Sequence, residues 1–280
     1  MLTRVIFNQK GGVGKSSIAV NLAALSAKQG HATLLIDLDP QANASQYILG
    51  QVALAHDLKQ GLEPNIEHYF QELLSSSTAK GLLGHTFGQL LKTRGKGLED
   101  YRHSSAFARL DVIPASPNLG ALTTQLETKH KIYKLRDAIQ QLEGRYTRIY
   151  IDTPPAFNFF SLSALIAADR VLIPFDCDVF AERALQTLID NVFETQADHN
   201  QRLEIEGIIV NQYQAQAKLS REMVHALKKQ GLPVLENMLP ASVIMKASHQ
   251  HNMPLTHFDA RHKLTQAYQS LFNEIERQAS

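Results

Sequence analysis

The sequence predicts an α/β protein with a single doubly wound, mostly parallel sheet and helices on both faces. Three observations predict it. Short apolar segments alternate with segments of helical periodicity, the apolar segments are hydrophobic throughout, and a glycine-rich turn joins the first of them to the first helix. Strands that are apolar on both faces are typical of a parallel sheet covered by helices on both sides. We therefore expect one domain over residues 1–280.

The first forty residues establish the pattern. Residues 5–7 form a short apolar run, and a glycine-rich turn follows at 11–14. Residues 16–28 then place apolar side chains at helical spacing, and Gly30 ends this helix in the manner of a C-terminal cap. Residues 33–36 are again apolar throughout. Strand, glycine turn, helix and strand together predict a βαβ unit.

The alternation continues to the C-terminus except in one segment. Further strands are predicted at 110–114, 146–151, 170–174 and 205–210, and further helices at 131–141, 161–168, 181–195, 221–230 and 264–275. Between residues 50 and 109 no buried strand is obvious, and helices are predicted at 66–74 and 87–91. We interpret 50–109 as a helical insertion at the edge of the same domain.

Composition limits the function classes. The chain has 280 residues with 28 Lys and Arg against 27 Asp and Glu, a net charge of +1, so no global charge draws it to nucleic acid or to an anionic membrane. Cys177 is the single cysteine, which excludes a disulfide framework and a metal site built from several thiolates of one chain. No apolar run reaches about 18 residues, so no membrane span is predicted. These features predict a cytoplasmic protein.

The turn after the first strand has the composition of a phosphate-binding loop. It reads Gln9-Lys10-Gly11-Gly12-Val13-Gly14-Lys15-Ser16-Ser17, and its last residues match the end of a P-loop. The glycines let backbone N–H groups turn toward phosphate oxygens, Lys15 is placed to reach the β- and γ-phosphates, and the Ser16 hydroxyl can ligate Mg²⁺. The loop holds a second lysine, Lys10, and two lysines give more positive charge than one triphosphate requires from one chain. We predict that Lys10 serves a phosphate in a facing subunit, as an arginine finger does.

Carboxylates follow two further strands. Asp37 and Asp39 end the strand at 33–36, and Asp152 ends the strand at 146–151 as the acid of a Walker B motif does. The carboxyl ends of parallel strands lie beside a loop that follows a neighbouring strand. A single Asp after a strand is more often a helix N-cap, but three acids converging on one P-loop favour a catalytic and metal-binding role. One acid of the first pair can position water, and the other can hold the lysine or the Mg²⁺ shell.

Four stretches resemble the ParA group of deviant Walker A ATPases. They are residues 10–16, residues 37–43 (Asp-Leu-Asp-Pro-Gln-Ala-Asn), residues 151–155 (Ile-Asp-Thr-Pro-Pro) and residues 167–174, and the segment from Leu239 to Leu255 is similar as well. The resemblance covers nearly the whole chain apart from the insertion. It implies that Lys10 is the signature lysine that contacts nucleotide across a sandwich homodimer.

The resemblance also implies the other roles by position. Lys15 would bind the β- and γ-phosphates, Ser16 the Mg²⁺ and Ser17 the α-phosphate. Asp39 matches the residue associated with water activation, and Asp152 matches the Walker B acid. The resemblance further implies an adenine contact at Asn211 and closure over the base by the loop after Pro240. The implied cofactors are ATP and Mg²⁺.

The activity implied by the resemblance is a slow ATPase that moves or spaces cargo over the nucleoid. ATP drives dimerisation, the dimer binds DNA without sequence preference, and a ParB-like or cargo-adaptor protein stimulates hydrolysis. The cargo is a plasmid, a chromosome or a large protein assembly. This chain has Ala241 and Ile244 where members of the family usually carry arginines, so some of the family's DNA contacts are not expected here.

A basic segment supports the DNA interaction. Residues 213–263 hold seven Lys and Arg against three acids, a local charge of +4, which would be doubled in a dimer. The alternative interpretation is that these basic residues lie on ordinary solvated helix faces with no binding role. The candidate DNA contacts are Lys218, Arg221, Lys228, Lys229, Lys246, Arg261 and Lys263.

Three other functions use a similar loop. A MinD-like membrane ATPase would need a basic amphipathic C-terminal helix, whereas residues 261–280 carry a net charge of only +1 and their apolar stripe favours packing against the core. An iron–sulfur electron carrier needs two cluster cysteines per subunit, which the single Cys177 excludes. A metabolic kinase or synthetase stays an alternative, although no acceptor motif is visible.

Overall fold

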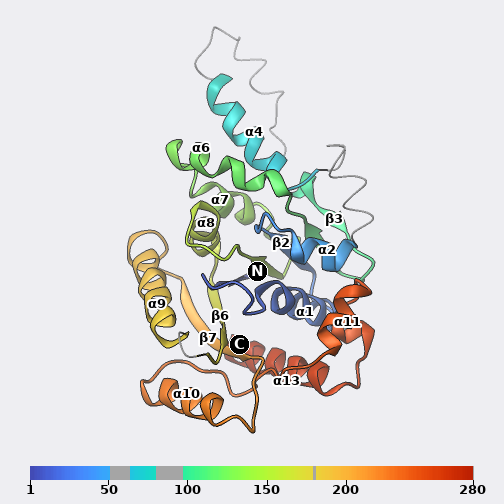
Figure 1. Ribbon diagram of the computed structural model, residues 1–280. Helices are drawn as coiled ribbons and strands as arrows, with labels where there is room; N and C mark the ends of the chain where they lie inside the picture. Colours follow the sequence, from blue (N-terminus) through green and yellow to red (C-terminus); the bar gives the residue numbers. More distant parts are fainter. Residues whose placement is uncertain (51–63, 80–96, 179–180, 280) are drawn as a thin grey trace.

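The computed structural model describes residues 1–50, 64–79, 97–178 and 181–279. Within these ranges seven strands form one sheet in the order β3-β4-β2-β5-β1-β6-β7, and all neighbours are parallel except β3 and β4 (Figure 1). The strands are β1 (Leu2–Ile6), β2 (Thr33–Asp37), β3 (His103–Ser104), β4 (Leu110–Ile113), β5 (Arg148–Asp152), β6 (Arg170–Asp176) and β7 (Glu204–Asn211). The predicted doubly wound fold is confirmed.

Helices cover both faces of this sheet. They are α1 (Lys15–Lys28), α2 (Asn43–Leu49), α4 (Ile66–Ala79), α6 (Thr123–Thr128), α7 (Lys134–Gln140), α8 (Phe159–Ala167), α9 (Ala181–Asp198), α10 (Lys218–Lys229), α11 (Ile244–Gln250), α12 (Leu255–Phe258) and α13 (Lys263–Gln278), with short 3₁₀ helices η1 (Leu98–Tyr101) and η2 (Pro117–Leu122). Each long helix predicted from periodicity overlaps one of them, whereas the short α2, α6, α11 and α12 were not predicted.

The core divides into two layers because successive strand residues point to opposite faces. In β2, Leu34 and Ile36 pack into the layer that includes residues of α7, α8 and α9, whereas Leu35 packs with α1 and α13. Tyr150 of β5 joins the second layer in the same way. All five residues of β2 are buried, as expected for a strand inside a covered parallel sheet. The sheet therefore places β1 between β5 and β6, and the loop after β1 lies at the centre of one edge.

The C-terminal helix is an integral part of the core. The stripe formed by Leu264, Tyr268, Leu271 and Ile275 is at most 3% exposed, which confirms the expected core packing. Buried Arg4 of β1 makes a bidentate ion pair with Glu206 of β7, at 2.7 and 2.8 Å, and a further pair with Glu276 of α13. Within the described residues no helix is long and apolar enough to span a bilayer.

The segment predicted as a helical insertion is joined to the core by aromatic packing. The ring of Phe70 on α4 contacts those of Phe159 and Phe160 on α8 at centroid distances of 5.7 and 5.6 Å. The segment also contributes β3, a two-residue antiparallel edge strand that was not predicted because it is short and half-exposed. The helix predicted at 66–74 extends further, to Ala79, as α4. The helix predicted at 87–91 lies outside the described residues.

Candidate nucleotide-binding site

The loop between β1 and α1 has the conformation of an anion-binding turn. Gly12 and Gly14 adopt positive φ angles of 78° and 92°, and Gly14 directly precedes α1. Asn8 supports the start of the loop, because its Oδ1 accepts the Lys10 N–H at 2.8 Å and its Nδ2 donates to the carbonyl of Pro174 at 2.6 Å. The loop therefore ends at a helix N-terminus, whose free N–H groups and dipole favour a negative ligand.

Asn211, at the end of β7, fixes the other side of the loop. Its Nδ2 donates to the carbonyl of Val13 at 2.9 Å, and Gln212 Nε2 reaches the carbonyl of Gly12 at 3.4 Å. The side chain that was expected to contact adenine thus holds the phosphate loop in this structure. Pro240 lies beside the segment that follows Asn211, because residues 213 and 240 form an isolated parallel bridge.

We expect Gly14→Ala to destabilise the protein. A Cβ at Gly14 would lie 2.3 Å from Nδ2 of Asn211, and the φ of 92° disfavours any L side chain. The variant should lose the Asn211–Val13 hydrogen bond and gain backbone strain of about 1–2 kcal/mol. Gly11→Ala is the matched control, because its Cβ would meet nothing within 4 Å and its φ is not positive. Thermal unfolding without ligand should separate the two, and equal midpoints would contradict this account of the loop.

Lys15 is the buried cation of the site. Its side chain belongs to a residue only 6% exposed, and Nζ donates to the carbonyl of Lys10 at 3.0 Å. Burial lowers the pKa of Lys15, while the carboxylates of Asp152 and Asp39 act in the opposite direction. An ammonium held at this position beside a helix N-terminus is suited to phosphate oxygens.

Two carboxylates meet where β2 and β5 end. Asp37 and Asp152 are register partners in the parallel ladder, and both are fully buried. Asp37 accepts hydrogen bonds from the N–H and Oγ of Ser45 at 2.9 and 2.7 Å and from the N–H of Asp39 at 3.0 Å. Burial nevertheless raises the pKa of Asp37 to about 6. The carboxylate of Asp37 therefore holds the segment that follows β2 through these hydrogen bonds.

Asp152 has no comparable set of donors. Among the described residues neither carboxylate oxygen has a hydrogen-bond partner of normal geometry. Burial, and next the neighbouring Asp37, raise the pKa of Asp152 well above its usual range, and Ser16 and Lys15 offset only part of this effect. A buried carboxylate of this kind needs a cation. Oxygen ligands from Asp152 and Ser16 suit Mg²⁺, so the residues present fit the predicted metal site.

Asp39 differs from Asp37 in facing the open space of the site. It is 5% exposed, and its Oδ1 accepts the N–H of Gln41 at 2.9 Å. Burial raises the pKa of Asp39, with Lys15 opposing. Only Asp39 of the two lines the pocket described below. Of this pair the structure therefore places Asp39, and not Asp37, beside the pocket.

The turn after Asp39 contains a strained alanine. Ala42 has φ 53° and ψ 33°, its N–H donates to the carbonyl of Asp39 at 2.8 Å, and its carbonyl accepts from Gln46 at 2.9 Å. Left-handed backbone is unfavourable for alanine and readily adopted by glycine. The strained residue therefore lies between Asp39 and the start of α2.

We expect Ala42→Gly to raise the free energy of unfolding by about 0.5–1 kcal/mol, because relief of the left-handed strain exceeds the added chain entropy of glycine. Ala44→Gly is the matched control: Ala44 is buried inside α2, and the change should lower stability by roughly 1 kcal/mol. Urea unfolding of both variants checks the signs. A loss of stability in Ala42→Gly would contradict the proposed strain.

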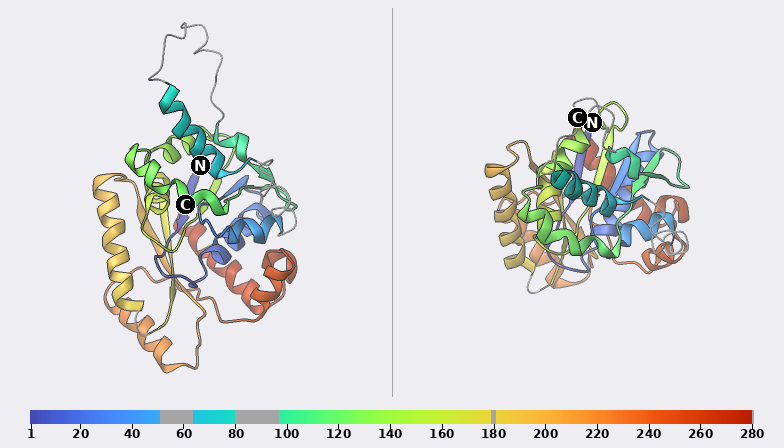
Figure 2. Two further views of the ribbon diagram at one scale, coloured as in Figure 1. Left: turned by 45° about the horizontal axis from the view of Figure 1, so that its top comes forward. Right: turned by 90° about the horizontal axis from the view of Figure 1, so that it is seen from above.

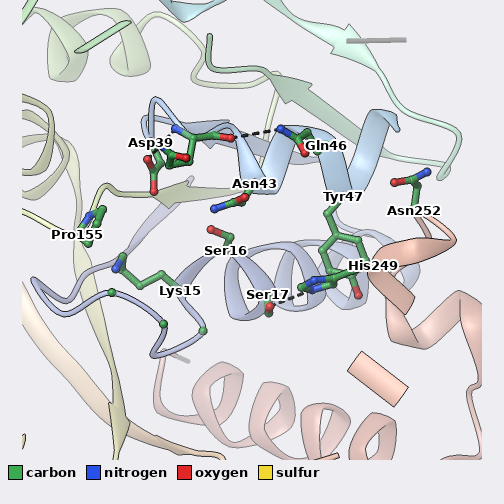
Figure 3. A pocket seen from close by; sticks show the side chains of 14 residues that line it. Lys15, Ser16, Ser17, Asp39, Asn43, Gln46, Tyr47, Pro155, His249 and Asn252 are labelled. Atoms are coloured by element: carbon green, nitrogen blue, oxygen red, sulfur yellow. Dashed lines mark hydrogen bonds between the residues drawn. The ribbon is translucent and has the colours of Figure 1, made fainter. Parts of the chain in front are cut away.

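A pocket of about 510 Å³ lies over these residues, between the loop, α2 and α11 (Figure 3). Its lining comprises Gly11, Gly12, Gly14, Lys15, Ser16, Ser17, Asp39, Gln41, Asn43, Gln46, Tyr47, Pro155, His249 and Asn252. The predicted loop residues and Asp39 are thus brought together. Of the other predicted site residues, Val13, Asp152, Asn211 and Pro240 are not among the lining residues.

The side of the pocket formed by α2 and α11 was missed by sequence reasoning. Tyr47 lies on α2, His249 on α11 and Asn252 in the turn after α11, and none of these segments carries a phosphate motif. His249 lies 232 residues after Ser17, yet its Nε2 is 3.0 Å from Ser17 Oγ. The similarity of the segment from Leu239 to Leu255 was the one available signal that this region belongs to the site.

Lys10 points elsewhere. It is not among the pocket's lining residues, and its Nζ forms an ion pair with Asp178, which follows β6. The side chains of Lys10 and Asp178 are 37% and 38% exposed. The two lysines of the loop therefore point to different places. Lys15 faces the pocket of its own chain, and Lys10 lies at the protein surface.

The candidate DNA contacts are all exposed but form two groups. Lys218, Arg221, Lys228 and Lys229 lie on α10, whereas Lys246, Arg261 and Lys263 lie around α11 and the start of α13. Figures 1 and 2 show α10 and α11 well apart, on different sides of the molecule. Two of the lysines have acidic neighbours: Lys218 pairs with Glu222 and Lys228 with Glu236. Residues 213–263 therefore do not form one continuous basic face in a single chain.

Residues 1–205 match the AAA domain family AAA_31. The chain is 30% identical over 275 residues to the chromosome partitioning protein ParA of Myxococcus xanthus, a match that covers 96% of this chain and 86% of that protein.

Two solved structures share the fold. Apo McdA of Cyanothece has a TM-score of 0.79 at 19% identity and is matched over 100% of both chains. Cobyrinic acid a,c-diamide synthase of Mycobacterium smegmatis, with a bound ATP analogue and magnesium, has a TM-score of 0.75 at 21% identity over 100% of this chain and 96% of that chain. Taken together with the loop geometry and the family match, the similarity to ParA shows that this chain belongs to the ParA/MinD family of partition ATPases.

Proposed function

We propose that this protein is an ATPase that forms a sandwich homodimer on ATP, binds DNA without sequence preference and positions a cargo over the nucleoid. The observation that carries the proposal is the different placement of the two loop lysines. Lys15 is buried beside Asp39 and Asp152, whereas Lys10 is half-exposed outside the pocket. A cation displayed beside a nucleotide site, and not inside it, is suited to act on the nucleotide of a facing subunit.

The geometry of the loop supports the following contacts to nucleotide. The positive-φ glycines and the N-terminus of α1 receive the phosphate chain. Lys15 binds the β- and γ-phosphates, and Ser17, one residue further into the helix than Ser16, takes the α-phosphate. The proposed contacts to the base are Asn211 and the loop after Pro240. They lie outside the lining of the pocket, and the Asn211 amide is joined to the phosphate loop at Val13.

The acids supply the chemistry of hydrolysis. Ser16 and Asp152 would hold Mg²⁺, which would supply positive charge to the phosphates. Asp39 lines the pocket together with Lys15, orients the attacking water and accepts its proton. The water oxygen bonds to the γ-phosphorus as the bond to the β-phosphate oxygen breaks. Asp37 does not touch the reactants: through Ser45 and the N–H of Asp39 it holds the segment that carries Asp39.

DNA binding is proposed to require the dimer. The chain has a net charge of only +1, and its exposed basic residues divide into the α10 group and the α11–α13 group. Phosphate contacts add with each neutralised charge, so one group of three or four cations binds DNA weakly. Bringing two chains together doubles the number of groups that can follow one duplex. ATP thereby controls the attachment.

The names of the relatives support a partitioning role, and the stimulating partner is part of our proposal. One is named a chromosome partitioning protein, and several others carry partition names. We propose a ParB-like or cargo-adaptor protein as the stimulator and a plasmid, a chromosome or a large assembly as the cargo. The proposed location is the cytoplasm, on the nucleoid.

Two alternatives predict different behaviour. In a MinD-like protein the terminal helix would have to leave the core, but here its stripe is at most 3% exposed and Glu276 pairs with Arg4 and Arg148. A synthetase shares the fold, as the cobyrinic acid a,c-diamide synthase shows. The relatives that match at about 30% identity over nearly the full length include partition proteins, which favours the ParA-like function.

Sedimentation of the purified chain with Mg²⁺ and ATP, with Mg²⁺ and ADP, and without nucleotide tests the proposal. A 31.2 kDa chain should double its mass with ATP alone. Lys15→Ala is the control that should stay monomeric in all three conditions. A wild-type chain that keeps the same mass in all three would overturn the ATP-driven dimer.

A further inference from the structure

His249 is distant from the phosphate loop in sequence but lies beside the end of that loop in space. Its Nε2 lies 3.0 Å from Oγ of Ser17, and the side chain lines the pocket (Figure 3). The residue is exposed at the rim, so the imidazole is not a core group and can meet a ligand. The contact joins α11 to the first turn of α1, where the proposed function places the end of the phosphate chain nearest the nucleoside.

The imidazole is held in place by its neighbours. The ring of Tyr47 packs edge-on against it, with centroids 4.2 Å apart and an interplanar angle of 61°. The Tyr47 hydroxyl is hydrogen-bonded to Oγ of Ser248, and Ser248 Oγ donates to the carbonyl of Met253 at 2.6 Å. These contacts fix both the ring and the backbone of α11 next to it, so His249 is preorganised before any ligand arrives.

Asn21 completes the framework from within α1. Its Nδ2 donates to the carbonyl of Ser17 at 2.8 Å, and its Oδ1 accepts the N–H of Leu255 at 2.8 Å. The first turn of α1 and the segment after α11 are therefore linked by the same side chain. Ser17 is held through its backbone by Asn21 and through its hydroxyl by His249.

The protonation of the pair follows from what a phosphate can accept. Burial lowers the pKa of His249, which favours the neutral ring. A phosphate oxygen only accepts hydrogen bonds. The hydroxyl of Ser17 must therefore donate to the ligand, and this is achieved when Nε2–H of His249 donates to Ser17 Oγ.

We propose that His249 is a positioning residue of the nucleotide site, which orients the Ser17 hydroxyl toward the α-phosphate of ATP and ADP. This inference rests on the proposed nucleotide binding. It assigns a role to a residue of α11 that carries no phosphate motif. It predicts an effect that is the same for di- and triphosphate, because the γ-phosphate lies at the Lys15 and Asp39 end of the pocket.

Equilibrium binding of ATP and ADP to the full chain, with Mg²⁺, tests the inference. His249→Ala should weaken both nucleotides by the same factor, roughly tenfold, as expected for one lost hydrogen bond to a charged group. His249→Gln, whose amide can still donate, should recover most of the affinity. His251→Ala is the matched control: His251 stacks on Phe258 outside the pocket and should leave binding unchanged.

A double-variant cycle separates positioning from a structural effect. If His249 acts through Ser17, then Ser17→Ala with His249→Ala should bind no more weakly than the weaker single variant. Additive losses, a loss for ATP alone, or unchanged binding by His249→Ala would each overturn the inference. A wild-type chain that binds neither nucleotide would instead contradict the proposed function.

Discussion

Lys10→Ala should bind ATP within a few-fold of the wild-type affinity and yet fail to form the ATP-bound dimer. The Nζ of Lys10 is paired with Asp178 and does not line its own pocket, so its removal leaves the ligand contacts of one chain intact. In the dimer the same lysine would be missing from the partner's nucleotide. ATP hydrolysis should therefore fall by about 10³-fold, as when a finger residue is removed, or to background.

Nucleotide titration and sedimentation on the same preparation measure the two effects separately. Thermal stability should hardly change, because an exposed ion pair contributes about 0–1 kcal/mol. Lys134→Ala is the control: Lys134 is similarly exposed and pairs with Asp137 on α7. If Lys10→Ala forms dimers and hydrolyses ATP at the wild-type rate, the action of Lys10 on a facing subunit is wrong.

Asp39→Ala should trap the nucleotide-bound dimer. Asp39 lines the pocket and accepts one backbone hydrogen bond, so its loss removes the group that orients water while leaving the phosphate loop in place. General-base removal typically costs 10²–10⁴-fold in rate. ATP should stay bound, and the dimer should persist after free ATP is removed.

Single-turnover hydrolysis and the lifetime of the dimer are the measurements for Asp39. Asp198→Ala, at the exposed end of α9, is the matched carboxylate control and should behave as wild type. An Asp39→Ala variant that hydrolyses ATP normally would transfer the water-orienting role to another group. A variant that no longer binds ATP would show that Asp39 acts mainly on the ligand.

Much of the fold could be predicted because its signals are local. Glycines followed by Lys15 and Ser16 between a strand and a helix determine the loop, and the apolar runs determine β2 and β5. The positions of Asp39 and Asp152 follow, because parallel strands bring their carboxyl ends to one edge. These elements depend on residues close together in the chain.

The parts that were missed depend on distant contacts or short elements. The α2 and α11 helices have seven residues each, too few for periodicity to stand out. The approach of His249 to Ser17 requires α11 to pack beside α1. The division of the basic residues between α10 and α11 is likewise a result of tertiary folding, which a local charge count cannot show.

Retention of the chain on non-specific duplex DNA with ATP, with ADP and without nucleotide tests the central claim most directly. ATP alone should produce binding, the binding should weaken steeply with salt, and anionic vesicles should retain no protein under the same conditions. DNA binding that ignores the nucleotide, or ATP-dependent binding to vesicles in place of DNA, would contradict the account.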